Sequence, residues 1–132
     1  MPTAQEEKNI KLVIDAFNAL FNKRDYEFAW KFWSPDYVQR SLFVPPGKAG
    51  LFTLIPSIST EMRVEFGLAV ANDDVVFVHR RTSGHGAPNF VSADWFRVKD
   101  GLIVEHWDVM QDEVSEAESL SKRSMFGEAA LV

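Results

Sequence analysis

The segment from Ala93 to Val109 constrains the fold of this chain most, because it predicts two strands joined by a tight turn. Apolar and polar residues alternate on both sides of Lys99-Asp100-Gly101, and Asp-Gly between two such runs is a strong hairpin signal. Two turns fit this sequence. A two-residue loop would place Trp95 on the face of His106, whereas a three-residue loop with a left-handed glycine would separate them.

We predict the three-residue loop, because a slip of one residue would move every side chain to the other face of the sheet. The predicted cross-strand pairs are Val98 with Leu102, Phe96 with Val104 and Asp94 with His106. This register gathers the apolar side chains on one face. It also directs Asp94, His106 and Asp108 into the same concave region.

The rest of the chain changes from helical to strand periodicity near residue 60. Apolar residues spaced three and four apart predict helices over residues 3–23, 26–33 and 48–59. Thr3 and Asp25 are the expected N-caps, and Pro56 should stop or kink the third helix. An extended piece over 36–41 and alternation over 62–70, 75–82, 90–98 and 102–110 complete the pattern. We therefore predict a single α+β domain over 1–132, with three helices packed on one face of an antiparallel sheet.

Charge and composition narrow the classes of function. The formal net charge of -5 argues against a nucleic-acid partner or an anionic membrane surface, since both require clustered Lys and Arg. No apolar run approaches the roughly 20 residues that span a bilayer. The absence of Cys excludes disulfides and thiol nucleophiles. With no secretory signal visible, we expect a cytoplasmic protein. The 11 Phe and 4 Trp fit either an aromatic core or an apolar ligand cavity.

Two carboxylates and an imidazole in an apolar setting suggest acid–base chemistry. Burial and neighbouring charges shift the protonation of such groups, so that Asp108 with His106 could move a proton at carbon beside a carbonyl. A purely structural pairing of Asp94 with His106 is the competing interpretation. A metal site built from His106 and Asp108, with His79 or His85 as a third ligand, has weaker support because the ligand spacing is incomplete.

The hairpin ending in His106-Trp107-Asp108 resembles the closing hairpin of SnoaL-like proteins, the polyketide-cyclase-like branch of the nuclear-transport-factor-2-like superfamily. The first helix around Phe17, the piece Tyr37-Val38-Gln39 and the late Met125-Phe126 are also similar. The resemblance implies a cone-shaped α+β barrel, in which three N-terminal helices pack on a strongly curved antiparallel or mixed sheet around an apolar pocket.

The resemblance also implies roles for individual residues and for the outer face of the sheet. In polyketide cyclases of this family the Asp of the His-Trp-Asp motif is the general acid/base of an intramolecular aldol condensation, which assigns that role to Asp108 and makes His106 the motif histidine. From the predicted register we add His106 and Asp94 as residues that assist Asp108. It implies a homodimer through an outer sheet face carrying Trp95, Ile103, Trp107 and Val109. No cofactor and no metal are implied.

One departure bears on the substrate. Where relatives often have His-Asn, this chain has Arg40-Ser41. An inward Arg40 would bind a carboxylate or enolate oxygen, and a solvent-facing Arg40 would not. The residues expected to line the pocket are Phe17, Phe32, Tyr37, Arg40, Phe96 and Val104.

Two classes of function remain open at this point. The first is an acid–base enzyme acting on a small apolar carbonyl compound by cyclisation, isomerisation or a related reaction. The alternative is a non-catalytic dimeric protein that binds an apolar ligand or serves as an adaptor. A filled or closed cone would favour the adaptor.

Overall fold

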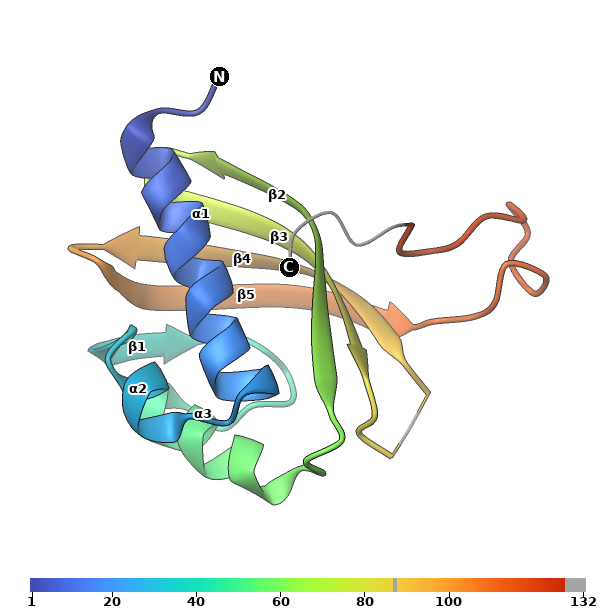
Figure 1. Ribbon diagram of the computed structural model, residues 1–132, viewed down its shortest axis with the longest axis horizontal. Coiled ribbons are helices and arrows are strands. Elements are labelled where there is room, and N and C mark those ends of the chain that lie inside the picture. The colour runs from blue at the N-terminus through green and yellow to red at the C-terminus, as the bar shows by residue number, and fades with distance from the viewer. Residues whose placement is uncertain (87, 128–132) are drawn as a thin grey trace.

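The computed structural model describes residues 1–86 and 88–127, whose arrangement is shown in Figure 1. The helical elements are α1 (Ala4–Phe17), a π-helical turn (Asn18–Asn22), α2 (Tyr26–Trp30), α3 (Gly47–Leu54) and a 3-10 turn (Ile55–Ser57). The strands are β1 (Trp33–Gln39), β2 (Arg63–Asn72), β3 (Val75–Ser83), β4 (Phe90–Lys99) and β5 (Leu102–Asp112).

The five strands form one mixed sheet in the order β1-β5-β4-β3-β2. The strands from β2 to β5 pair antiparallel with their neighbours, and β1 joins β5 in parallel. The long strands bend so that the sheet curves around α1 (Figure 1). The predicted α+β architecture, with three helices on a curved sheet, is confirmed. The sheet is nevertheless open, with β1 and β2 as its edges, and the helices rather than further strands complete the cone.

The local signals of the sequence act largely as predicted. Helix α1 begins with a capping box between Thr3 and Glu6, and the Asp25 side chain caps α2. Helix α3 ends just before Pro56, which has no N–H to continue the helical hydrogen bonds. The element after α2 differs, because β1 begins at Trp33, within the predicted second helix.

The core lies between α1 and the inner face of the sheet. Val13, Ala16 and Phe17 lie on one face of α1, and the π-helical turn continues this face through Leu20. The largest fully buried side chains outside this helical segment include Trp33, Phe66, Phe96 and Ile103. Burying one such side chain contributes about 1.5–3 kcal/mol. This packing fixes the inner face of the β4–β5 hairpin against the rest of the core.

The turn of the β4–β5 hairpin has two residues, so the predicted three-residue loop is wrong. Lys99 pairs with Leu102, and both Asp100 and Gly101 have a positive φ, as a type I′ turn requires. The predicted pairing of Val98 with Leu102 therefore does not occur.

A β-bulge follows the turn. Arg97 pairs with Glu105 while its neighbour Val98 pairs with Ile103, so that Val104 is an extra residue in β5. Without a bulge, the two-residue turn would direct His106 away from the core. The extra residue reverses the alternation and directs His106 inward.

Two further pairings from the predicted register are also wrong. Beyond the bulge, Phe96 pairs with His106 instead of Val104, and Asp94 pairs with Asp108 instead of His106. The predicted faces hold for all three polar residues, because each lies on the inner side of the sheet. The bulge therefore changes which residues of β4 and β5 are paired, but it leaves the three polar residues on the predicted face of the sheet.

The outer face differs from the expectation at one position. Ile103 is fully buried, since it precedes the bulge and packs inward beside Val98. Trp95 and Val109 are exposed on the outer face, as expected. Trp107 is partly covered there by the guanidinium groups of two arginines.

The chain after β5 folds back onto the outer face of the sheet. Phe126 is buried against Gly67 and the ring of His79, and a Cβ at position 67 would lie 3.2 Å from the Phe126 ring. The predicted anchor in the tail is confirmed for Phe126. Within the described residues, no helix combines the length and the apolar character needed to cross a membrane.

Candidate functional site

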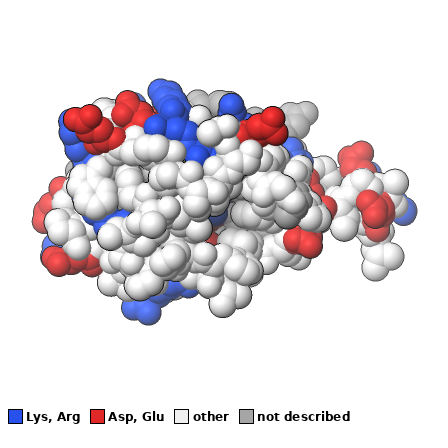
Figure 2. Space-filling view, turned by 90° about the horizontal axis from the view of Figure 1, so that it is seen from below, with Lys and Arg blue, Asp and Glu red and all other residues white. Residues whose placement is uncertain are grey.

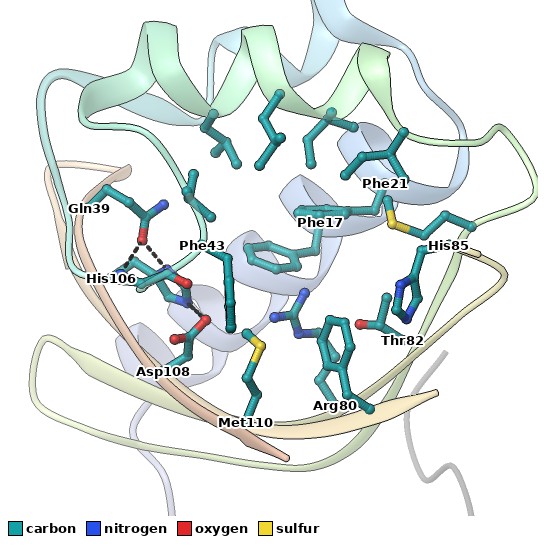
Figure 3. A pocket seen from close by; sticks show the side chains of 18 of the residues that line it. Phe17, Phe21, Gln39, Phe43, Arg80, Thr82, His85, His106, Asp108 and Met110 are labelled. Carbon is teal, nitrogen blue, oxygen red and sulfur yellow. Dashed lines mark hydrogen bonds and ion pairs between the residues drawn. The ribbon is translucent and has the colours of Figure 1, made fainter. Parts of the chain in front are cut away.

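A cavity of about 480 Å³ lies between the helices and the inner face of the sheet (Figure 3). Helical residues such as Phe17, Phe21 and Leu51 give it an apolar wall. Cavities of roughly 300–1,000 Å³ with few polar groups are typical of small-molecule sites. The polar lining includes Tyr37, Gln39, Arg80, Thr82, His106 and Asp108.

The surface on the side of α3 carries few charged groups at its centre. Figure 2 views the molecule from below Figure 1, where α3 lies, and shows Lys, Arg, Asp and Glu gathered mainly at the margins of this face. Phe43 both lines the cavity and is 64% exposed, so it lies at the opening. An apolar molecule can therefore approach the cavity without crossing a ring of charge.

Asp108 presents its carboxylate to the cavity from β5. Its side chain is only 5% exposed, and no described residue donates a hydrogen bond to it. The ring nitrogen Nε2 of His106 is 4.0 Å from Asp108 Oδ2, which is beyond hydrogen-bond distance. A buried carboxylate normally has hydrogen-bond partners, because desolvation without them is costly. This carboxylate is thus free to interact with a ligand.

His106 lies between two hydrogen-bond acceptors. Its Nδ1 is 2.7 Å from Gln39 Oε1, and its Nε2 is 2.9 Å from Asp94 Oδ1. The backbone N–H of Ser41 donates to the same Gln39 oxygen at 3.0 Å, which fixes the orientation of the amide. Both ring nitrogens must carry a proton to satisfy both acceptors. The contacts therefore favour an imidazolium beside Asp108.

Asp94 is the fully buried anchor of this network. Its two oxygens accept from Arg80 Nη2 at 3.0 Å and Nε at 3.1 Å, and the Ser92 hydroxyl donates at 2.6 Å. Burial by itself raises the pKa of Asp94. The Arg80 charge and the bonds from His106 and Ser92 outweigh burial and hold the pKa at about 2. Asp94 therefore stays ionised and holds its partners in place.

Tyr37 adds a neutral donor to the wall of the cavity. Burial raises the pKa of its phenol well above the usual range, and the charges of Asp108 and Asp94 act in the same direction. The phenol oxygen accepts a hydrogen bond from Gln39 Nε2 at 2.7 Å. In that bond the Tyr37 oxygen is the acceptor, so the phenol O–H can still donate a hydrogen bond to another group.

The two carboxylates and the imidazole predicted to act together do lie close to one another, but they differ in their access to the cavity. Asp94, His106 and Asp108 have ligand atoms that all lie within 4.8 Å of one another. His106 and Asp108 line the main cavity, whereas Asp94 lies behind His106 and does not. Among the residues expected to line the pocket, Phe17 and Tyr37 do so.

The other four residues expected in the lining lie elsewhere. Phe96 stacks under the His106 ring at a centroid distance of 4.7 Å, below the cavity wall. Phe32 packs against Phe28, and Val104 is the extra residue of the bulge. Arg40 has a 52% exposed side chain and forms an ion pair with Glu105 at 2.6 Å, so its inward alternative does not occur.

An inward arginine is present at a position that the sequence analysis did not select. Arg80 lines the cavity with its guanidinium over the rings of Phe17 and Phe21. Its Nε and Nη2 bond to Asp94, and no described residue accepts a hydrogen bond from Nη1. The alternation in β3 contained the signal, since every second residue from Val76 to Thr82 faces inward and Arg80 belongs to that set.

A metal could compete with the proton-transfer interpretation. Asp94, His106 and Asp108 could supply three ligands. His79 cannot serve as the third ligand suggested by sequence, because it lies on the outer face against Phe126. A metal on Nε2 would replace the proton that His106 shares with Asp94. The hydrogen bonds on both sides of the ring therefore fit a doubly protonated His106 better.

Comparison with known proteins identifies the family and the fold. The SnoaL-like domain matches residues 14–106, so Asp108 lies just beyond the matched region. A candidate ketosteroid isomerase from Kribbella flavida superposes with a TM-score of 0.76 at 15% identity, over 95% of this chain and 97% of the other. An LEH-like epoxide hydrolase from M. tuberculosis gives 0.68 at 19% identity, over 81% and 85%.

A candidate SnoaL-like polyketide cyclase from Jannaschia sp. CCS1 gives a TM-score of 0.70 at 16% identity, over 84% of this chain and 90% of the other. These identities support a shared fold and no more. A search of curated proteins found no match. Because the domain match covers more than half of the sequence, this chain belongs to the SnoaL-like family.

Proposed function

We propose that this protein is an acid–base enzyme acting on a small, largely apolar carbonyl compound, with Asp108 as the proton-transferring group. The observation that carries the proposal is the contrast between the Asp108 carboxylate and its surroundings. It faces a cavity of about 480 Å³, and no described residue satisfies it by a hydrogen bond. A carboxylate in such a position can accept a proton from a bound ligand.

The reaction step can be written with the groups of the cavity. Asp108 accepts a proton from carbon next to the carbonyl, and the C–H electron pair moves to form an enolate. Arg80 Nη1 is suited to donate to the oxygen on which negative charge develops. The charge thereby passes from Asp108 to the enolate oxygen, and the protonated Asp108 returns the proton to carbon. The imidazolium of His106, held by Gln39 and Asp94, remains nearby throughout.

Deuterium exchange tests this step without knowledge of the natural substrate. The bicyclic ketone 1-tetralone has an acidic C–H next to its carbonyl, and NMR in deuterated buffer follows its loss. We expect the wild type to accelerate exchange and Asp108→Asn to lose at least about 100-fold of that acceleration, the scale of general-base catalysis. Asp36→Asn, which removes the same charge from an exposed part of β1, is the matched control.

Full exchange by Asp108→Asn would contradict the assignment of Asp108. Binding of the ketone by wild type without any exchange would favour the non-catalytic binding protein instead. The open cavity argues against the adaptor alternative, whose expected sign was a filled cone. The activities named for the structural relatives include isomerisation, cyclisation and epoxide hydrolysis. Fold does not choose among them.

We also propose that two copies pair through the outer face of the sheet. Exposed apolar side chains gather on this face, namely Leu68, Val70, Trp95 and Val109. Such a patch is costly in water and is typical of an interface. Light scattering at micromolar concentration should give twice the chain mass, and Val109→Asp should give the monomer mass. A monomeric wild type would contradict the proposal.

A further inference from the structure

The segment between β1 and α3, residues 40–46, borders the opening of the cavity. Its Phe43 side chain is part of the cavity wall and is 64% exposed. Among the described residues, no other large apolar side chain is both exposed to water and part of this wall. In the view of Figure 3, Phe43 extends toward Met110 of β5, which also lines the cavity. Phe43 is therefore placed to control access to the cavity.

The two ends of this segment are fixed by contacts with their neighbours. At the first end, the backbone N–H of Ser41 donates to Gln39 Oε1 at 3.0 Å. At the second end, a Cβ on Gly50 would lie 2.5 Å from the carbonyl oxygen of Pro45, so α3 packs closely against that proline. Exposed side chains exchange rotamers rapidly. The Phe43 ring can therefore move about its side-chain bonds while the backbone at both ends of the segment stays in place.

The exposed ring and the uncharged segment determine what a ligand meets at the opening. Residues 41–47 contain no charged side chain. Removing apolar surface from water is favourable, so a ring exposed at an opening gains burial by covering an apolar ligand. A carboxylate beneath the ring would lose its hydration, which is costly without a partner. The segment therefore favours a ligand whose outer end is apolar.

We propose that Phe43 is a specificity-determining residue, whose ring folds over the bound ligand, closes the opening and selects a ligand with an apolar outer end. This inference rests on the proposed function only for the cavity as the site of the ligand. Closure also removes water from the cavity that Asp108 lines. Removal of water strengthens the electrostatic interactions between the Asp108 carboxylate and the ligand.

Fluorine NMR of protein that contains 4-fluorophenylalanine at its 11 Phe positions tests closure directly. The shift difference between H2O and D2O reports the exposure of each ring, and Phe43→Leu and Phe28→Leu assign the two signals needed. Saturating 1-tetralone should remove most of the difference at Phe43. Phe28, which is exposed on α2 and does not line the cavity, should keep its difference. An unchanged difference at Phe43 in the bound protein would overturn the closure.

Calorimetry measures how much the ring contributes to binding. Phe43→Ala should weaken the affinity for 1-tetralone about tenfold, the scale of burying the exposed part of a phenylalanine side chain. Leu42→Ala is the matched control, because Leu42 is 85% exposed beside Phe43 and does not line the cavity. Its affinity should equal that of wild type. Equal affinities of Phe43→Ala and wild type, or equal losses in both variants, would contradict the role of Phe43.

Two substituted ketones test the selection of an apolar outer end. Position 6 of 1-tetralone is distant from the carbon next to the carbonyl. Wild type should bind 6-methyl-1-tetralone about tenfold or more tightly than 6-carboxy-1-tetralone, because the carboxylate would lose its hydration. In Phe43→Ala this ratio should shrink, since the outer end then reaches water. Tighter binding of the carboxylate by wild type, or the same ratio in both proteins, would overturn the selection.

The deuterium-exchange assay separates this inference from the proposed function. Protection of the Phe43 ring by 1-tetralone, without exchange at carbon, leaves the closure standing and overturns the catalytic role of Asp108. Exchange that depends on Asp108, without protection of the ring, overturns the closure alone. Failure of 1-tetralone and both substituted ketones to bind at millimolar concentration would overturn both.

Discussion

Asp94 and Asp108 face each other directly across β4 and β5, yet their surroundings are opposite. Asp94 accepts bonds from Arg80, Ser92 and His106 and is fully buried. Asp108 lines the cavity and receives no hydrogen bond from the described residues. Two aspartates that are paired across the sheet thus have different roles. Asp94 stabilises the structure, whereas Asp108 is left available for chemistry.

This difference arises from the neighbouring strands. Asp94 lies on β4 next to β3, so that Arg80 can reach it from the adjacent strand. Asp108 lies on β5, where the neighbouring β1 directs Gln39 to His106 and not to the carboxylate. Position within the sheet therefore decides which aspartate is neutralised.

Asp94→Asn should destabilise the fold strongly. The substitution leaves the Arg80 and His106 charges buried without their carboxylate, and removing one partner of a buried ion pair costs about 3–5 kcal/mol. Urea unfolding followed by tryptophan fluorescence measures the free energy of unfolding. A loss below 1 kcal/mol would mean that Asp94 is not the anchor of the network.

Acid should remove the contribution of Asp94. Its pKa is lowered from an ordinary 3.8 to about 2 in the folded state, so its stabilisation is present above pH 3.8 and is lost as the pH falls through 2. The lowered pKa corresponds to a contribution on the order of 2 kcal/mol. The difference in unfolding free energy between wild type and Asp94→Asn should shrink across this window. A constant difference from pH 5 to pH 2 would contradict the lowered pKa.

Gln39→Leu should change the protonation of His106 with a smaller loss of stability. The leucine removes the acceptor of the Nδ1 proton, and an unpaired buried donor costs about 1–3 kcal/mol. Nitrogen NMR of the imidazole should show two protonated ring nitrogens in wild type and one in the variant, because only wild type offers an acceptor to each ring nitrogen. Gln39→Glu retains an acceptor and should restore the second proton. One protonated nitrogen already in wild type would contradict the imidazolium.

Asp108→Asn should have the smallest effect on stability. No hydrogen bond is lost, and the neutral amide avoids the cost of burying a charge, while the weak attraction to His106 disappears. We expect an unfolding free energy within about 1 kcal/mol of wild type. A loss comparable to that of Asp94→Asn would mean that the two aspartates do not differ in role.

Most of the architecture could be predicted from periodicity and local signals. The alternation from Met62 to Met110 predicted all four strands of the antiparallel part, and the cap at Thr3 predicted the start of α1. The register of the hairpin could not be predicted, because the bulge at Val104 has no local sequence signal. The bulge depends on burial of Ile103 before it and of His106 after it, which only the assembled core determines.

The site could be predicted only in part, because it depends on contacts between strands as well as on alternation within one strand. His106 and Asp108 could be found because they alternate on one strand. The network that distinguishes Asp94 from Asp108 requires Arg80 and Gln39 from two other strands, and their proximity follows from strand order. Arg40 was selected for its place in a familiar motif, but it lies on the outer side, where Glu105 pairs with it.

The absence of cysteine from the sequence permits a direct test of whether Asp108 meets the reacting carbon of a ligand. The reagent 2-bromo-1-tetralone carries its electrophilic carbon next to the carbonyl, where Asp108 would take a proton. Mass spectrometry of Asp108→Cys should show alkylation that saturates with reagent and is blocked by 1-tetralone. Asp36→Cys, on an exposed part of β1, should react without saturation or protection. Equal, unsaturable and unprotected reaction of both variants would contradict the central claim that Asp108 faces a bound ligand.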